Sequence, residues 1–311
     1  MADCDNLFRE FSERVKLSAP KKDSLRTSRD SLRQKVKDKF KDKGYAVKFF
    51  WQGSFAMNTI ITPKDGDYDI DDGIYIGTDS EPKESIATLH GWIAEAAEDH
   101  TSKKPEDKNT CVRVLFADGH HIDLVLYYFA GSEHPSLAHK RDGWVPSDPK
   151  EFMDWFRAKC DDDGQLKRIV RYFKAWGDNL RGDMPSGLVF TIWAAENMIS
   201  HERDDIAFLE TMKKIQGALK ISFVCYRPTT PKNEDLVTGY SETRRKYFLD
   251  RLNSFIISGE QALEESNQKD ACLKWKRHFG ERFPCGMAED SLDKAKSHES
   301  PAFIRTDARS A

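Results

Sequence analysis

A strand-like segment crowded with carboxylates constrains this chain more than any other part of its sequence. Residues 67–76 read Asp-Tyr-Asp-Ile-Asp-Asp-Gly-Ile-Tyr-Ile. A calcium-binding EF-hand loop needs Gly at its sixth position and Glu at its twelfth, and a loop starting at 67 has neither. In a strand, alternate side chains share a face, so Asp69 and Asp71 stand together and Asp72 points the other way. Asp67 would lie on the same face of the strand, so it is an alternative member of the pair.

Neighbouring carboxylates on one face repel each other unless a cation lies between them, and hard oxygen ligands suit Mg²⁺. The alternative is an acidic strand end that simply faces water. Gln52-Gly53-Ser54 follows an aromatic strand, and such a turn lets phosphate approach backbone amides. Asp123 lies in an apolar strand, where a carboxylate is costly unless it is hydrogen-bonded, paired or metal-bound. Together these features are typical of a two-metal site for phosphoryl transfer.

The first half of the chain mixes helix and strand patterns, which predicts an α+β fold. Apolar residues at helical spacing predict helices over 24–43 and 82–100, and Gly44 ends the first of them. Residues 1–20 look like an irregular lead-in. Strands are predicted over 45–51, 68–76, 111–116 and 121–129, with Asp118-Gly119 as a hairpin turn.

The second half is mostly helical. Asp148-Pro149 caps one helix, and others are predicted over 165–179, from about 186, over 242–254 and over 260–278. We therefore expect a core at 1–145 that includes the long N-terminal helix, and an α-helical lobe at 146–285, with a cleft between them. Residues 286–311 are polar and predict a disordered tail.

Composition excludes several classes of protein. The chain is 39% hydrophobic and 32% charged, which excludes collagen-like, coiled-coil and wholly disordered chains. A net charge of −3 gives no global basic excess for polyanion binding, so a nucleotide site must be a local basic patch. The six cysteines lack the paired spacing of disulfide scaffolds and zinc ribbons. Without a signal-peptide core or a membrane-length apolar run, we expect a reduced, cytoplasmic protein.

Several motifs resemble the cGAS/DncV-like nucleotidyltransferases, and among them the DncV-type cyclic GMP-AMP synthases of bacteria. The family pattern is Gly-Ser, a spacer, an acid-x-acid pair and a third acid on a later strand. That pattern reads here as Gly53-Ser54, Asp69-Ile70-Asp71 and Asp123. The matching stretches fall in order at 52–55, 69–73, 110–113, 121–123, 147–150, 154–156, 173–176 and 185–186.

The resemblance implies a polymerase-β-like nucleotidyltransferase core with a mixed sheet, backed by a C-terminal α-helical lobe. It implies two Mg²⁺ ions, with Mn²⁺ as a substitute, and ATP and GTP as substrates. The activity would be template-independent synthesis of a cyclic oligonucleotide, with a purine cyclic dinucleotide as product, in bacterial antiphage signalling. The product would activate an effector. In some operons of the family a ubiquitin-transfer-like enzyme joins the synthase's C-terminus to a target. Neither a membrane nor a template nucleic acid is expected.

The resemblance also implies roles for particular residues. Asp69, Asp71 and Asp123 would be the catalytic metal ligands. The nucleotide-binding residues would be Gln52, Gly53, Ser54, Arg113, Lys174, Ser186, Asn233 and Asp235. Lys174 would hold the triphosphate on a basic helix face shared with Lys167 and Arg171, although such a face is also typical of plain solvation.

Other residues have a purely structural interpretation as well as a functional one. Ser186 would contact phosphate, or serve only as a helix N-cap. Arg113 would contact substrate or face solvent, and Asn233 and Asp235 would read base edges or lie in a polar surface loop. The helical insert before Lys174 is much shorter than in DncV-type enzymes, which argues against their folate-type regulatory pocket.

Two other functions stay open at this point. One is a nucleotidyltransferase that modifies an RNA end, a protein or a small molecule, and the near-neutral charge argues against RNA. The other is a non-catalytic, nucleotide-bound scaffold, against which the presence of all three carboxylates argues.

Overall fold

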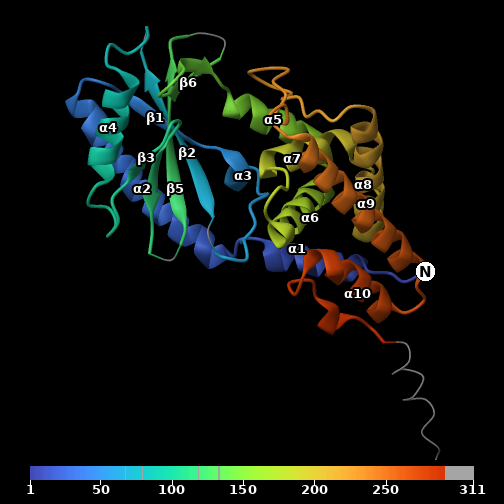
Figure 1. Ribbon diagram of the computed structural model, residues 1–311. Coiled ribbons are helices and arrows are strands. Elements are labelled where there is room, and N and C mark those ends of the chain that lie inside the picture. Colours follow the sequence, from blue (N-terminus) through green and yellow to red (C-terminus); the bar gives the residue numbers. More distant parts are fainter. Residues whose placement is uncertain (67, 79, 118, 132–133, 291–311) are drawn as a thin grey trace, which may run out of the picture.

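The computed structural model describes residues 1–66, 68–78, 80–117, 119–131 and 134–290, and confirms the α+β fold, with a mixed sheet beside an α-helical lobe (Figure 1). The helices are α1 (Asp5–Val15), α2 (Ala19–Asp42), α3 (Gly53–Ala56), α4 (Ile86–Ala97), α5 (Pro149–Lys159), α6 (Gln165–Leu180), α7 (Gly187–Asn197), α8 (Asp204–Ile221), α9 (Glu242–Glu264), α10 (Gln268–Phe279) and the short 3₁₀ helix η1 (Cys285–Met287). The strands are β1 (Val47–Trp51), β2 (Asp69–Gly77), β3 (Glu106–Asp107), β4 (Val112–Leu115), β5 (His121–Phe129), β6 (Ser136–His139) and β7 (Gly143–Pro146).

The sheet places β2 and β5 side by side at its centre. Its strand order is β1-β2-β5-β4-β3, and β6 pairs with β5 and with β7. β2 and β5 run parallel, whereas the other pairs are antiparallel. β4 and β5 pair as the predicted hairpin requires, although Asp118 of its turn lies outside the described residues, as does Asp67. The parallel pairing brings the acidic starts of both strands to the same edge.

One face of the sheet is covered by α2 and α4 (Figure 1). Leu32, Val36 and Phe40 of α2 pack with Leu89 and Ile93 of α4 in one apolar cluster. Alternate side chains of β2 and β5 complete this cluster, namely Ile74, Ile76, Ile122, Leu124 and Leu126. The opposite face of these two strands is thereby left for the site.

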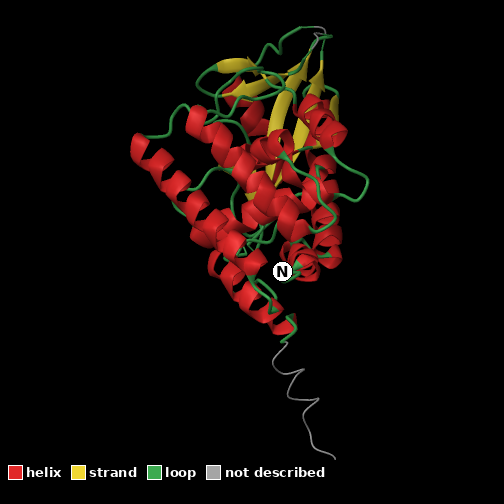
Figure 2. Ribbon diagram, turned by 90° about the vertical axis from the view of Figure 1, so that its right-hand side faces the viewer, coloured by secondary structure: helices red, strands yellow, loops and turns green. Residues whose placement is uncertain are grey.

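The helical lobe forms the other end of the molecule (Figure 2). Its large core is rich in aromatic rings and draws on α1 and on α5 to α10. The prediction for residues 1–20 is wrong, because 5–15 form α1, whose Phe8 and Phe11 are fully buried in this lobe. The break between the last two helices falls at 265–267, later than predicted. We propose the boundary near 146, with 1–15 assigned to the helical lobe. The predicted disordered tail, 286–311, is wrong at its start, because 286–287 belong to η1 and Ala288 packs against the core of this lobe. Its residues from 291 onward lie outside the described residues.

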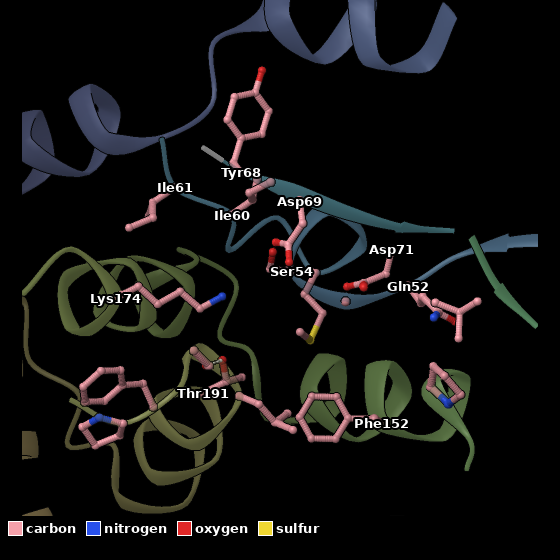
Figure 3. A pocket seen from close by; sticks show the side chains of 18 of the residues that line it. Gln52, Ser54, Ile60, Ile61, Tyr68, Asp69, Asp71, Phe152, Lys174 and Thr191 are labelled. Atoms are coloured by element: carbon pink, nitrogen blue, oxygen red, sulfur yellow. Dashed lines mark hydrogen bonds between the residues drawn. The ribbon is translucent and has the colours of Figure 1, made fainter. Parts of the chain in front are cut away.

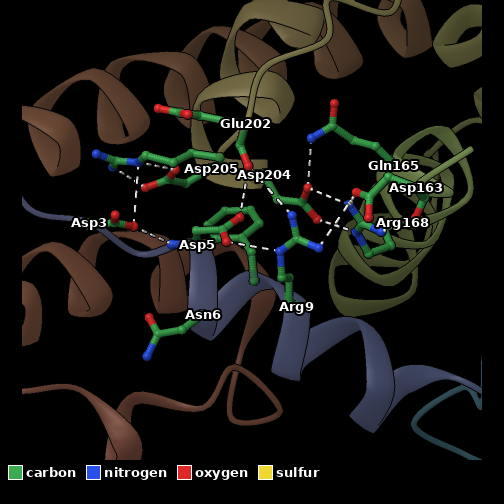
Figure 4. A network of polar contacts seen from close by, with 12 residues as sticks. Asp3, Asp5, Asn6, Arg9, Asp163, Gln165, Arg168, Glu202, Asp204 and Asp205 are labelled. Atoms are coloured by element: carbon green, nitrogen blue, oxygen red, sulfur yellow. Dashed lines mark hydrogen bonds and ion pairs between the residues drawn. The ribbon is translucent and has the colours of Figure 1, made fainter. Parts of the chain in front are cut away.

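A buried ionic network fixes the N-terminal segment to this lobe (Figure 4). Asp204, fully buried at the start of α8, accepts two hydrogen bonds from Arg168, at 2.6 and 2.9 Å, and one each from Gln165 and Tyr172. The Asp204 N–H donates to Asp5 of α1 at 2.6 Å. A buried carboxylate is tolerated when its oxygens are so fully used.

The described cysteines depart from the expectation of a fully reduced protein. Cys272 of α10 and Cys285 of η1 form a disulfide, 13 residues apart in the sequence. Cys4, Cys111, Cys160 and Cys225 are free. Among the described helices, none combines the length and apolar character needed to cross a bilayer.

Candidate active site

The three predicted carboxylates lie on neighbouring strands at one edge of the sheet. Asp69 and Asp71 point from β2 to the same side, and Asp71 stands directly opposite Asp123 in the parallel register with β5. Asp69 is the most open, with 57% of its side chain exposed, whereas Asp123 is 8% exposed. Asp72 points to the other face, as predicted, and pairs there with Arg33 of α2. The strand interpretation of the acidic segment is therefore confirmed.

The Gly-Ser turn before α3 is fitted tightly against β2. Gly53 has a φ of 66°, and a Cβ at this position would overlap the Oδ2 atom of Asp71. The N–H of Gln52 donates to the Asp71 carbonyl at 3.3 Å, and its side-chain amide donates to the Tyr127 hydroxyl at 3.2 Å. Ser54 lies in the cavity wall, and Figure 3 shows it beside Asp69. Only glycine allows the turn and the carboxylate to approach so closely.

The carboxylates are a fitting donor set for a divalent cation. Burial, followed by the charges of Asp69 and Asp123, raises the pKa of Asp71 to about 7. Such a rise means that the ionised oxygens lack enough positive charge around them, which a bound cation would supply. Carboxylate oxygens are the ligands preferred by hard divalent metals. A second group with metal-ligand chemistry comprises His134, Asp148 and Glu151. Its carboxylates already accept backbone N–H bonds, Asp148 at the start of α5 and Glu151 from Thr230.

Lys174 reaches from α6 of the helical lobe toward the carboxylates (Figure 3). Its ammonium donates to the carbonyl and hydroxyl oxygens of Thr59, at 3.2 and 3.3 Å. Burial lowers the pKa of Lys174 to about 8, against the opposing influence of Asp69 and Asp71. A Cβ at Gly187 would lie 3.1 Å from the lysine Cε, so a small residue is needed there.

The prediction that α6 presents a basic face to phosphate is wrong for Arg171. Arg171 is buried and donates to the Ser12 hydroxyl at 2.9 Å and to the Asn58 carbonyl at 2.8 Å. It therefore joins α1, α6 and the segment after α3, and it is not available to a phosphate. Spacing along the helix could not distinguish a solvated face from an interface between lobes.

Arg113 contacts a carboxylate. Its guanidinium forms two bonds with Asp123, Nε to Oδ1 and Nη2 to Oδ2, both at 2.8 Å. Its Nη2 also lies 4.0 Å from Asp69 Oδ2. The prediction that Arg113 contacts nucleotide stays a prediction.

The remaining predicted residues lie at or beside the cavity. Ser186 is exposed and caps α7, accepting from the Val189 N–H at 3.4 Å, while its neighbours Pro185 and Gly187 line the cavity. Asp235 accepts from the N–H groups of Cys225 and Val237 and so holds its own loop together. Asn233 lies in the same loop with a φ of 64°.

A cavity of about 840 Å³ lies between the sheet and the helical lobe, and residues of both line it. Sequence reasoning missed part of its wall. The missed polar residues are Tyr68, Thr110, Tyr127, Ser147, Asp148, Asp178, Arg181, Thr191, Arg227 and Thr230. Arg227 and Thr230, not Asn233 and Asp235, bring the 227–236 loop to the cavity. The available signal was the basic Arg227 beside two prolines, which is too common to be informative.

Known proteins share this sequence pattern and fold. Residues 47–127 match the family described as "Cyclic GMP-AMP synthase DncV-like, nucleotidyltransferase domain". A cyclic GMP-AMP synthase of Escherichia albertii is 28% identical, over 85% of this chain and 60% of that protein. One from Vibrio cholerae is 26% identical, over 77% of this chain and 68% of that protein. The chain thus spans only about 60% of the length of the first relative.

Solved structures agree with the fold. Apo DncV of Vibrio cholerae superposes with a TM-score of 0.75 at 22% identity, covering 90% of this chain and 96% of that one. A mutant of the same enzyme in complex with ATP and GTP gives 0.79 at 20% identity, covering 91% and 98%. This likeness establishes a shared fold that includes the helical lobe.

Proposed function

We propose that this chain, whose residues 47–127 form a DncV-like nucleotidyltransferase domain, synthesises a purine cyclic dinucleotide from ATP and GTP without a template. The observation that carries the proposal is the convergence of Asp69 and Asp71 with Ser54 and Lys174 on one cavity between two lobes. Asp123 stands directly opposite Asp71 on the neighbouring strand. Acids that hold metal and donors that hold phosphate are the two requirements of in-line phosphoryl transfer.

The relatives support a product that contains purines. The Escherichia albertii and Vibrio cholerae proteins are cyclic GMP-AMP synthases, and one Vibrio cholerae DncV structure holds the linear intermediate pppA(3′,5′)pG. A cyclic AMP-AMP-AMP synthase of Acinetobacter is 20% identical over 81% of its length, so ring size is an outcome to be measured.

In the proposed mechanism, Asp69, Asp71 and Asp123 would hold two Mg²⁺ ions, for which Mn²⁺ would substitute. When bound, these ions lower the pKa of the attacking ribose hydroxyl and offset negative charge on the phosphates. Ser54 and Lys174 hold the β- and γ-phosphates, with Ser186 at the edge, while Gln52 and Gly53 seat the turn against Asp71. The hydroxyl attacks the α-phosphorus, its proton passes to solvent and pyrophosphate leaves. The linear product then reorients, and attack by its free ribose hydroxyl on the remaining α-phosphorus releases a second pyrophosphate and a second proton and closes the ring.

We also propose the biological setting that the family resemblance supports. The product would activate an effector in antiphage defence, in the cytoplasm, where nucleoside triphosphates are abundant. A ubiquitin-transfer-like partner would act on the C-terminus. Asn233 and Asp235 would influence base choice only by shaping the loop that presents Arg227, because Asp235 is occupied by backbone N–H groups.

The test is incubation of the purified chain with Mg²⁺ and all four ribonucleoside triphosphates, followed by phosphatase treatment and mass spectrometry. We expect a phosphatase-resistant species with the mass of a cyclic dinucleotide. The double variant Asp69→Asn/Asp71→Asn should keep its circular dichroism spectrum and form no product. Nucleotide transfer only to an added RNA, protein or small molecule would favour the first alternative, and nucleotide binding without any transfer would favour a scaffold.

A further inference from the structure

Arg113 is bonded to Asp123, the third carboxylate of the site. Across the sheet, Arg113 of β4 stands directly opposite Asp123 of β5, and Asp123 stands opposite Asp71 of β2. The three side chains therefore form one row on the face that looks into the site. A row fixed by strand register cannot be rearranged without breaking the ladder.

The guanidinium engages both oxygens of Asp123. The two bonds are parallel and 2.8 Å long, which is the strong bidentate geometry of an arginine–carboxylate pair. The Asp123 side chain is 8% exposed and that of Arg113 is 27% exposed, so water screens the pair weakly. A guanidinium is not deprotonated in proteins, so the charge of Arg113 is permanent.

The lysine of the site is engaged elsewhere. Lys174 donates to Thr59, and the acids that act on its charge are Asp69 and Asp71. Arg113 is therefore the counter-charge of Asp123 in particular. A divalent metal that binds Asp123 must share its oxygens with this cation and tolerate its repulsion.

We propose that Arg113 is a positioning residue that holds Asp123 and opposes a divalent metal there, so that metal occupies Asp123 only together with nucleotide. Phosphate oxygens would offset the repulsion and offer the guanidinium another anionic partner. The nucleotide half of this inference rests on the proposed function. The half that concerns Arg113, Asp123 and metal stands on the geometry alone.

The experiment is a titration of the full chain with Mn²⁺ alone, followed by electron paramagnetic resonance of free Mn²⁺. Arg113→Gln removes the charge and should bind Mn²⁺ about tenfold more tightly than the wild type. Arg113→Lys keeps the charge and should stay near the wild type. Equal or weaker binding by Arg113→Gln would overturn the proposal.

A charge-balanced variant covers the case in which Arg113→Gln does not fold. Arg113→Gln/Asp123→Asn removes both members of the pair and leaves no lone buried charge. If Arg113 already prevents metal alone from binding Asp123, the loss of Asp123 removes no ligand, and this variant should bind Mn²⁺ like the wild type. Binding about tenfold weaker would mean that Asp123 ligates metal despite Arg113, and the inference would be wrong. Since the readout is metal binding, absence of a cyclic product would count against the proposed function and not against this inference.

Discussion

Replacing Gly53 by Ala should disable the site while leaving most of the fold intact. A residue with a Cβ held at a φ of 66° costs about 1–2 kcal/mol. The new Cβ would also overlap Asp71 Oδ2 and lie 3.2 Å from Asp71 Cγ. To relieve this overlap the carboxylate must move by about 1 Å, and a misplacement of that size costs about 100-fold in rate.

Gly44, just after α2, provides a matched control. Its φ is 85°, and a Cβ there would meet nothing within 4 Å. In urea unfolding, each Ala variant should lose about 1–2 kcal/mol through its backbone, with some addition at Gly53 from the overlap. In a pyrophosphate-release assay, only Gly53→Ala should lose about 100-fold in kcat/KM. Equal activity of the two variants would refute the argument that Gly53 is required in order to seat Asp71.

Three further predictions concern charge, the buried network and the disulfide. Because burial lowers the pKa of Lys174 to about 8, its ammonium loses its proton as the pH rises through that value. Nucleotide affinity measured by calorimetry should therefore fall above about pH 8 in the wild type and stay level in Lys174→Arg, which remains charged. Asp204→Asn removes the buried carboxylate of the two that pair with Arg168 and leaves only the more exposed Asp163, so it should cost about 3–5 kcal/mol in urea unfolding; a loss near zero would contradict the network's role. Reducing the Cys272–Cys285 bridge, which closes a loop of 13 residues, should cost about 3 kcal/mol, and Cys272→Ser should make stability insensitive to reductant.

The acidic strand shows where sequence reasoning succeeds. Two-residue periodicity predicts which face each carboxylate takes, because the backbone alone sets that alternation. Asp69 and Asp71 accordingly face the site, and Asp72 meets Arg33 of α2 on the covered face. Asp71 and Asp123 stand opposite each other because β2 and β5 pair in parallel. The family pattern implies that the two acids meet, but local sequence does not determine which strands pair.

Sequence reasoning fails at interfaces between segments that are distant in the chain. Arg171 and Lys174 occupy one face of α6, yet Arg171 is buried between Ser12 and Asn58 while Lys174 borders the cavity. In α1 the apolar residues Leu7, Phe8, Phe11 and Val15 do recur at helical spacing, a local signal that the prediction of an irregular segment overlooked. The sequence could not show that Asp5 accepts a hydrogen bond from the Asp204 N–H, 199 positions away (Figure 4). Such contacts have no local periodicity, so pattern reasoning assigns their members to solvent.

The segment between α3 and β2 explains why the helical lobe is part of the site and not an accessory to it. Its carbonyl groups accept from the helical half of the chain at three points, Asn58 from Arg171, Thr59 from Lys174 and Thr62 from Arg282. The Thr62 N–H also donates to the Val15 carbonyl at the end of α1. This segment follows the turn at Gly53 and Ser54 and precedes Asp69 in the chain, so its position sets the spacing between that turn and the first carboxylate. A nucleotidyltransferase core without the helical lobe would keep its three acids on β2 and β5 but lose the cations that hold this spacing, because each of them comes from α6 or from the segment after α10.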